Sequence, residues 1–153
     1  VGMLEKASGS ESMIESSIII KSDLQSVFDA FYHLPHWVNV LHDVIDVDLQ
    51  YDDGTHQVFT MTVVRPSGME TVRGIRIADK HVSITLCQTT PPPGFLKMHG
   101  YWYFTPAAEG VFVRAVRDVK WVEPEATGKR EGNLRDCLTR NLITFKEHLE
   151  NGH

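Results

Sequence analysis

Cysteine and long apolar runs are scarce in this sequence. The two cysteines, Cys87 and Cys137, lie far apart in a chain of 153 residues, and neither belongs to a CxxC pair or a Cys/His cluster. A disulfide framework and a zinc site are therefore not indicated, and we expect both thiols to be reduced and structural. No apolar run approaches the roughly 20 residues that cross a bilayer, and the first residues lack the basic and apolar zones of a signal peptide. We expect a cytoplasmic protein without membrane association.

Positive charge is also in short supply. The chain has 15 Lys and Arg against 20 Asp and Glu, which gives a formal net charge of -5. Nucleic-acid binding proteins need clustered Lys and Arg to displace the counterions of phosphate, so we expect no nucleic-acid partner. The eight histidines form no set of metal ligands: His33 and His36 have the spacing of helical ligands, but Pro35 lies between them. We expect no metal and no cofactor.

The beginning of the sequence predicts a strand and two short helices. Ile14 to Ile20 is rich in isoleucine, whose β-branched side chain suits a strand. Ser22 and Gln25 have the spacing of a capping box at the start of a helix, which Pro35 ends. A second short helical segment is expected to begin at His36 to Val38.

Six stretches with alternating apolar and polar residues follow, at about 44–51, 57–64, 70–78, 82–89, 96–104 and 111–121. The connections between them are short and rich in Pro, Gly and Asp, which predicts an antiparallel meander. In the first stretch, the expected apolar face consists of Ile45, Val47, Leu49 and Tyr51.

The last segment has the three- and four-residue spacing of an amphipathic helix. We expect Asn133 to cap its best-defined part and Gly152 to follow its end. The expected fold is an α+β helix grip, in which a curved seven-stranded antiparallel sheet wraps around this helix and two short helices lie between the first two strands. Residues 13–151 would form a single domain, and residues 1–12 a disordered terminus or a remnant of expression.

The chain lacks the usual catalytic signatures, such as GxSxG, HExxH and a phosphate-binding glycine loop, so function must be inferred from the residues that face the interior. Apolar residues of the stretch 96–104 alternate with more polar ones, and this alternation places Met98 and Trp102 inside. They are either plain core or part of a ligand site. Gly100 lies between them and favours the second alternative, because it frees volume in which a ligand could lie.

Two polar residues also fall on inward faces. Arg117 alternates with apolar neighbours, so it either pairs with an interior carboxylate or offers its guanidinium to a ligand. Asn141 lies on the inward stripe of the last helix, where its amide either forms a helix-to-sheet hydrogen bond or contacts a ligand.

The stretch Arg76 to Asp79, the Met98-x-Gly100-x-Trp102 pattern and the strand from Val113 to Val119 resemble the aromatase/cyclases of bacterial type II polyketide synthases. These are START-like helix-grip proteins, also grouped with the birch-pollen-allergen fold, and the likeness spans about residues 16–150. The resemblance implies a cavity that receives a linear poly-β-ketone from an acyl carrier protein and folds it. Aldol ring closure and dehydration to an aromatic ring would follow. A ketosynthase complex is a candidate further partner, and the protein is expected to be a monomer or a homodimer.

By the same resemblance, the cavity arginine of the family falls on Arg76 and the tryptophan after the first helix on Trp37. The Met and Trp strand pair falls on Met98 and Trp102, which are expected to bind substrate. The expected catalytic residues are Arg76 and Arg117, and the rest of the substrate-binding set is Val72, Gly100 and Asn141. Two positions depart from the family: Arg117 replaces a histidine that some members carry before an Asp, and Val44 replaces a tyrosine.

The orientation of Arg76 is a point of conflict. Strand alternation alone would bury Ile75 and Ile77 and turn Arg76 outward together with Val72 and Gly74. The resemblance turns Arg76 inward, and we follow it; a β-bulge, or a dimer contact that covers the two isoleucines, would reconcile the two patterns.

The chemistry of a poly-β-ketone suits a cavity of this kind. A methylene between two carbonyls is already acidic, so the difficult step is to choose which carbon attacks which carbonyl, and this is a matter of positioning. A guanidinium stays protonated and cannot act as a base, but it can stabilise an enolate or alkoxide oxygen. The main alternative is a non-catalytic carrier of a lipid, sterol or quinone. A third hypothesis is an interaction module that uses the outer face of Tyr101 and Tyr103.

Overall fold

The computed structural model describes residues 11–66, 68–123 and 127–151. Its elements follow the predicted order of one strand, short helices, six strands and a long helix. They are β1 (Glu11–Ile20), α2 (Leu24–Tyr32), the 3-10 helix η1 (Leu34–His36), α3 (Trp37–Val40), β2 (Val44–Asp52), β3 (His56–Arg65), β4 (Gly68–Asp79), β5 (Ser83–Thr90), β6 (Phe95–Ala107), β7 (Gly110–Trp121) and α4 (Thr127–Glu150).

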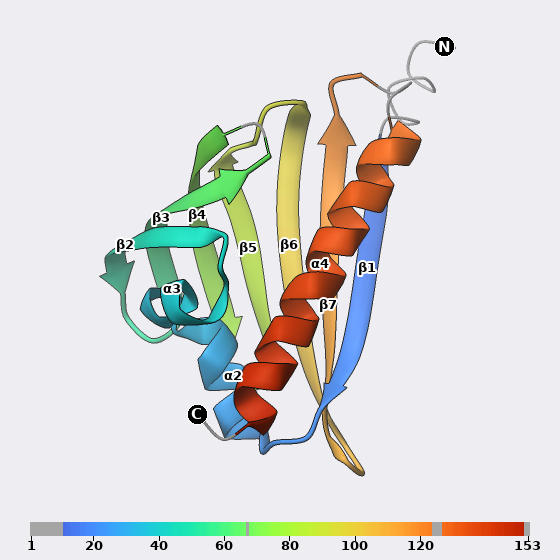
Figure 1. Cartoon of the computed structure of the whole chain (residues 1–153). Helices are drawn as coiled ribbons and strands as arrows, with labels where there is room; N and C mark the ends of the chain where they lie inside the picture. Colours follow the sequence, from blue (N-terminus) through green and yellow to red (C-terminus); the bar gives the residue numbers. More distant parts are fainter. Residues whose placement is uncertain (1–10, 67, 124–126, 152–153) are drawn as a thin grey trace.

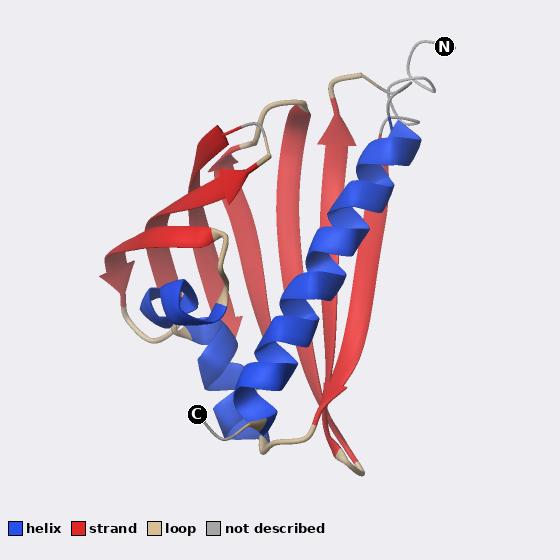
Figure 2. Ribbon diagram, in the orientation of Figure 1, coloured by secondary structure: helices blue, strands red, loops and turns tan. Residues whose placement is uncertain are grey.

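The seven strands form one curved sheet in the order β1-β7-β6-β5-β4-β3-β2, and every neighbouring pair is antiparallel. α4 lies across this sheet, while α2 and α3 lie beside its C-terminal half (Figures 1 and 2). The predicted helix-grip architecture is therefore confirmed. No helix among the described residues is long and apolar enough to cross a membrane.

The predicted start of the first helix is wrong by one residue. The helix is capped by Asp23, whose side chain accepts hydrogen bonds from the backbone N–H of Ser26 at 3.0 Å and from its hydroxyl at 2.7 Å. The capping box of Ser22 and Gln25 is not formed, because a carboxylate placed directly before the first helical residue satisfies the free N–H groups itself.

The terminal helix and the first strand both begin earlier than predicted. α4 starts at Thr127 rather than near Asn133, in a stretch whose polar residues have no apolar periodicity. Contacts with the sheet hold this first turn: the carboxylate of Glu131 accepts a hydrogen bond from the hydroxyl of Ser12 at 2.5 Å. The same hydroxyl accepts one from the indole N–H of Trp121 at 3.1 Å, so Ser12 belongs to the sheet although the domain was expected to begin at residue 13. Residues 1–10 and Gly152 lie outside the described residues.

The two faces of β4 are the reverse of those that alternation alone predicts. Val72, Gly74 and Arg76 face inward and are buried, whereas Ile75 and Ile77 are 38% and 48% exposed. The orientation implied by the family resemblance is thus confirmed for Arg76. No bulge turns it inward, because burial alternates strictly from Val72 to Ala78.

β2 also departs from its predicted pattern. Its register against β3 shifts between Val44 and Asp46 and again between Leu49 and Tyr51. Because each shift breaks the simple alternation of faces, Ile45 and Tyr51 are exposed while Val47 and Leu49 are half-buried. The prediction that all four form one apolar face is wrong for Ile45 and Tyr51.

A cluster of aromatic rings closes one end of the space between α4 and the sheet. The ring of Phe31 lies 5.5 Å from that of Phe104 and 4.1 Å from that of Phe145, and Phe28 lies 5.2 Å from Phe104. These residues join α2, β6 and the C-terminal part of α4 into a solid core. The space toward the N-terminal part of α4 is not filled in this way.

Candidate ligand-binding cavity

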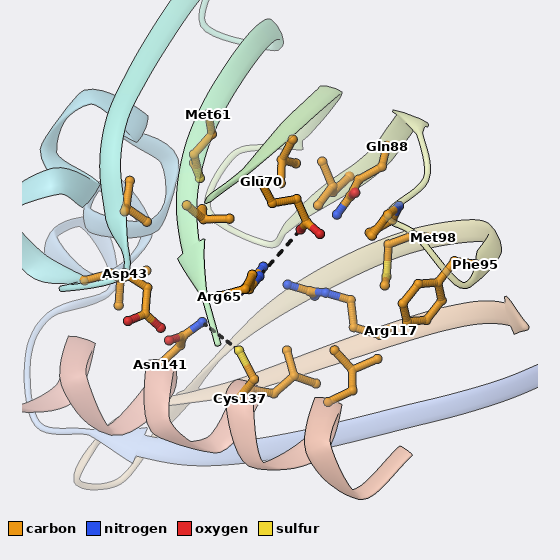
Figure 3. Close-up of a pocket in the computed structure, with 18 of the residues that line it drawn as sticks. Asp43, Met61, Arg65, Glu70, Gln88, Phe95, Met98, Arg117, Cys137 and Asn141 are labelled. Atoms are coloured by element: carbon orange, nitrogen blue, oxygen red, sulfur yellow. Dashed lines mark hydrogen bonds and ion pairs between the residues drawn. The ribbon is translucent and has the colours of Figure 1, made fainter. Parts of the chain in front are cut away.

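A cavity of about 640 Å³ lies between α4 and the concave face of the sheet, a volume typical of small-molecule sites. Figure 3 shows side chains of the sheet, such as Gln88, Met98 and Arg117, pointing into it, with Cys137 and Asn141 of α4 on the opposite side. Its exposed lining residues mark the mouth. They lie near the start of β2, in the β3–β4 and β5–β6 turns, and on α4: Asp43, Pro66, Pro93, Asn133, Asp136 and Arg140.

Arg76 is 1% exposed, and its guanidinium binds the end of α2. One terminal nitrogen donates to the carbonyl of Phe31 at 2.6 Å, and the other donates to the carbonyl of Tyr32 at 3.2 Å. The last carbonyls of a helix have no partner within the helix and carry partial negative charge, so they suit a buried cation. Arg76 therefore has a structural role as well as a place in the cavity wall.

Gln57 completes this arrangement and was missed by the sequence reasoning. Its side chain is fully buried; its amide oxygen accepts from Arg76 at 3.0 Å, and its amide nitrogen donates to the carbonyl of Tyr32 at 2.9 Å. The signal was present in the sequence, because Gln57 alternates in phase with the inward residues Phe59 and Met61.

Arg76 and Arg117 stand at the two ends of one inward-facing row across four strands. In this row Arg76 pairs with Leu86, Leu86 with Gly100 and Gly100 with Arg117. The guanidinium carbons of the two arginines lie 5.1 and 4.7 Å from the centre of the same ring, that of Trp102. The two cations are therefore within about 10 Å of each other and share one aromatic partner.

The guanidinium of Arg117 occupies the space above Gly100. A Cβ atom at position 100 would lie 2.8 Å from a terminal nitrogen of Arg117 and 3.1 Å from its guanidinium carbon. The volume that Gly100 frees was expected to hold a ligand, and that expectation is wrong, because the arginine fills it. Direct contact of Gly100 with a substrate remains a prediction.

Neither cavity arginine has a carboxylate partner among the described residues. The ion pairs found there join other groups, so the alternative in which Arg117 pairs with an interior carboxylate is not realised. Burial lowers the pKa of Arg76 to about 9, an effect to which the charge of Arg117 adds, and burial lowers the pKa of Arg117 to about 10. Both guanidinium groups remain charged at neutral pH, and the negative charge of Asp52 offsets that of Arg76 only in part.

The other predicted site residues also line the cavity: Trp37, Val72, Met98, Trp102 and Asn141. Asn141 makes only a weak contact, in which its amide nitrogen lies 3.9 Å from the sulfur of Cys137 (Figure 3). The predicted helix-to-sheet hydrogen bond of Asn141 is not found among the described residues. The roles of all five residues in substrate binding remain predictions.

The two cysteines are free and differ in position. Cys137 lies in the cavity wall, whereas Cys87 is exposed on the outer face of β5. The expected structural role is therefore wrong for Cys87, which packs against no core.

Three buried polar atoms of the cavity wall have no hydrogen-bond partner in the structure: Nε1 of Trp37, Nε of Arg76 and Oε1 of Gln88. Unpaired buried polar atoms are rare and call for an explanation, such as a ligand or bound water. Gln88 was missed by the sequence reasoning, although it continues the inward alternation of Ile84 and Leu86. Each of these atoms would gain a partner if a ligand or a water molecule reached it.

The acidic residues that line the cavity lie toward its mouth. Asp43 and Asp136 are exposed, and Glu70 forms an ion pair with Arg65 at 3.5 Å across the β3–β4 turn (Figure 3). Among the described lining residues, no histidine or carboxylate lies beside Arg76 or Arg117. The inner cavity can therefore polarise ligand oxygens, but it supplies no obvious general base.

Several solved structures are similar to this chain. Two are di-domain aromatase/cyclases: StfQ of the steffimycin biosynthetic pathway (TM-score 0.81, 20% identity, 97% of this chain and 55% of that one) and BexL of the BE-7585A pathway (TM-score 0.80, 22% identity, 96% and 52%). The chain thus spans about half the length of these two proteins. The Zhui aromatase/cyclase from Streptomyces sp. R1128 matches with a TM-score of 0.70 and 13% identity over 88% of each chain.

No protein-family model matches the sequence, and no curated protein matches it either. These three structural likenesses are below 25% identity and bear on the fold alone. Together with the sheet order and the long terminal helix, they show that this chain has the START-like helix-grip fold of the polyketide aromatase/cyclases.

Proposed function

We propose that this protein is an aromatase/cyclase of aromatic polyketide biosynthesis. It would receive a linear poly-β-ketone from an acyl carrier protein, fold it in the cavity and promote regiospecific aldol cyclisation and dehydration. The observation that carries the proposal is a pair of guanidinium groups in the cavity wall, that of Arg76 buried and that of Arg117 half-buried, with no ion-pair partner among the described residues. A lipid or sterol offers little to such groups, whereas a chain of ketone oxygens offers an acceptor at every second carbon.

The division of labour follows from the geometry. Trp37, Trp102 and Met98 provide flat and flexible apolar walls against which the chain can fold. The N–H groups of Trp37 and Arg76 that have no partner among the described residues would donate to ketone oxygens of a substrate that reaches them. Their effect on the rate would come from holding one reactive conformation and from stabilising the negative charge that develops on oxygen.

Proton transfer is assigned to water and to the substrate itself. The methylene groups of a poly-β-ketone are acidic because two carbonyls flank each of them, and the nearby cations make them more so. This explains how a cavity without a buried carboxylate or histidine can support the reaction.

The test is reconstitution with a ketosynthase pair and an acyl carrier protein, with products separated by chromatography. Arg117→Gln and Arg76→Lys are expected to lower the cyclised aromatic product at least tenfold and to raise spontaneously cyclised by-products. Arg114→Gln on β7 and Arg73→Gln on β4 are matched controls, because both arginines lie in the same strands and point away from the cavity. Unchanged product from both cavity variants would refute the proposal.

A non-catalytic carrier of a hydrophobic ligand is the second candidate, favoured by the absence of a general base near the two arginines among the described lining residues. The same experiment separates the two functions. A carrier leaves the ratio of cyclised to spontaneous products unchanged when it is added, whereas a cyclase changes it. Arg76→Ala, if it folds, is also expected to lose cyclised product, while Tyr103→Ala on the outer face is not.

A further inference from the structure

The two cavity arginines differ in how well their charge is compensated. The terminal nitrogens of Arg76 bind three protein oxygens, those of Phe31, Tyr32 and Gln57. Among the described residues, Arg117 donates one hydrogen bond to the protein, from a terminal nitrogen to the neighbouring carbonyl of Val116 at 3.0 Å. Most N–H groups of Arg117 therefore remain available to a ligand.

The guanidinium of Arg117 also lies against an aromatic ring and a glycine. Its carbon lies 4.7 Å from the centre of the Trp102 ring, and its atoms lie in the space that a Cβ atom of residue 100 would occupy. Gly100 thus leaves room for the planar guanidinium beside Trp102. Such a group favours a planar partner with two oxygens side by side, which can accept two parallel N–H bonds.

We propose that the cavity binds 1,3-dicarbonyl ligands as planar enolates, whose two oxygens accept two N–H bonds from Arg117. This rests on the proposed function, because the 1,3-dicarbonyl is the repeating unit of a poly-β-ketone. On binding, one C–H or enol O–H proton leaves for the solvent, and its electron pair is shared by the two oxygens. Arg76, whose guanidinium carbon lies 5.1 Å from the centre of the same Trp102 ring, adds a second positive charge nearby.

A carboxylate also presents two oxygens, but it suits this cavity less well. Its charge is concentrated and strongly hydrated, so its transfer into an apolar space costs more. The charge of an enolate is spread over a conjugated system, whose apolar flanks can pack against Met98 and Trp102.

Other charged or ionisable groups lie near the same cavity, and their influence on the ionisation of the bound ligand must be distinguished from that of Arg117. Cys137 on α4 is near Arg117, and the guanidinium of Arg76 lies near the same Trp102 ring. The charged groups toward the mouth are Asp43, Arg65, Glu70, Arg130, Asp136 and Arg140. A titration between about pH 5.5 and 8 keeps both cavity arginines mostly charged, and it is repeated with Cys137→Ser, for which the result is expected to stay the same.

The experiment is a spectrophotometric titration of 1-phenylbutane-1,3-dione bound to the full chain, since its enolate absorbs at longer wavelength than its neutral forms. We expect the apparent pKa of the bound ligand to fall by at least one unit, which corresponds to a tenfold or greater preference for the enolate. Arg117→Gln should abolish most of this shift, Arg117→Lys should keep less than half of it, and Arg114→Gln should keep all of it.

Two further ligands sharpen the result. 4-Phenylbutan-2-one cannot form such an enolate, and its affinity should not change with pH. 4-Phenylbutanoate should bind at least tenfold more weakly than the diketone at pH 8. Equal binding of this carboxylate, an unshifted diketone titration, or a full shift in Arg117→Lys would each overturn the inference.

The outcome is separable from that of the proposed function. If the diketone binds without ionising while reconstitution still gives cyclised product, the enolate inference fails and the cyclase proposal stands. If the enolate shift is present but added protein leaves the product ratio unchanged, the cyclase proposal fails and the binding inference stands. Circular dichroism of each variant shows that a loss does not reflect unfolding.

Discussion

The hydrogen bond between Arg76 and Gln57 should be a main determinant of stability, and a double-mutant cycle can measure it. Gln57→Leu keeps the volume of the side chain but removes the acceptor that lies 3.0 Å from Arg76 and the donor that lies 2.9 Å from the carbonyl of Tyr32. A hydrogen bond to a charged group contributes about 1.5–3 kcal/mol, and the carbonyl of Tyr32 also loses one of its two side-chain donors, although Arg76 still donates to it at 3.2 Å. We expect Gln57→Leu to lower the free energy of unfolding by about 2–4 kcal/mol.

The second arm of the cycle is Arg76→Met, alone and combined with Gln57→Leu. Removing the cation leaves the carbonyl of Phe31 without its side-chain donor and that of Tyr32 with Gln57 as its remaining side-chain donor, so this variant should also be less stable. In the double variant, however, Gln57→Leu no longer deprives a buried charge of a partner. The two losses should therefore fall short of additivity by about 1–3 kcal/mol.

The assay is urea-induced unfolding followed by tryptophan fluorescence and circular dichroism at pH 7. Gln50→Leu is the matched control, since Gln50 is an exposed glutamine on β2 that also bonds two side chains; it should change stability by no more than about 0.5 kcal/mol. Additivity of the two cavity variants within about 0.5 kcal/mol would show that the two side chains do not act as a unit.

Three further predictions concern other parts of the molecule. Gly100→Ala should displace the guanidinium of Arg117 from Trp102 and weaken diketone binding at least tenfold, with little effect on the urea midpoint because only the end of a flexible side chain must move. An alkylating label on Cys137 in a Cys87→Ser background should block ligand binding measured by fluorescence, whereas the same label on Cys87 in a Cys137→Ser background should not. Backbone hydrogen bonds in the β2–β3 turn lower the pKa of Asp53. Its contribution to stability is therefore present above its unfolded pKa and declines below about pH 4. In Asp53→Asn, the free energy of unfolding should decrease less steeply as the pH falls below this value.

The meander from β2 to β7 could be predicted because alternation and short turns are local properties of the sequence, whereas the pairing of β1 with β7 joins distant parts of the chain and was not predicted. The errors arose where a tertiary contact outweighs a local pattern. Near the start of α4, Glu131 binds the hydroxyl of Ser12, a residue 119 positions away. The polar sequence around Glu131 has no apolar periodicity that would predict a helix there. In β2, two register shifts move Ile45 and Tyr51 to the surface, and such shifts depend on the partner strand.

The inward face of β4 could not be chosen from hydrophobicity alone. Its concave side carries Val72, Gly74 and Arg76, while the convex side carries two isoleucines. A cavity wall does not need the largest apolar residues, because part of its surface faces a ligand space rather than other side chains. The neighbouring strand β3 carried a signal for the inward orientation of Arg76. Gln57 alternates in phase with the inward residue Phe59, and its amide oxygen can accept a hydrogen bond from a buried cation.

The shared contact with Trp102 explains why two like charges occur in one apolar cavity. Repulsion between them is reduced because each guanidinium lies near the negative face of an aromatic ring, and Arg76 also lies near that of Trp37 at 5.3 Å. Arg76 is further held by helix carbonyls, so its loss should be felt in folding. Arg117 binds no helix carbonyl, so its replacement should weaken ligand binding and leave the fold intact. A strong loss of stability in Arg117→Gln, with ligand binding preserved, would mean that this division between the two arginines is wrong.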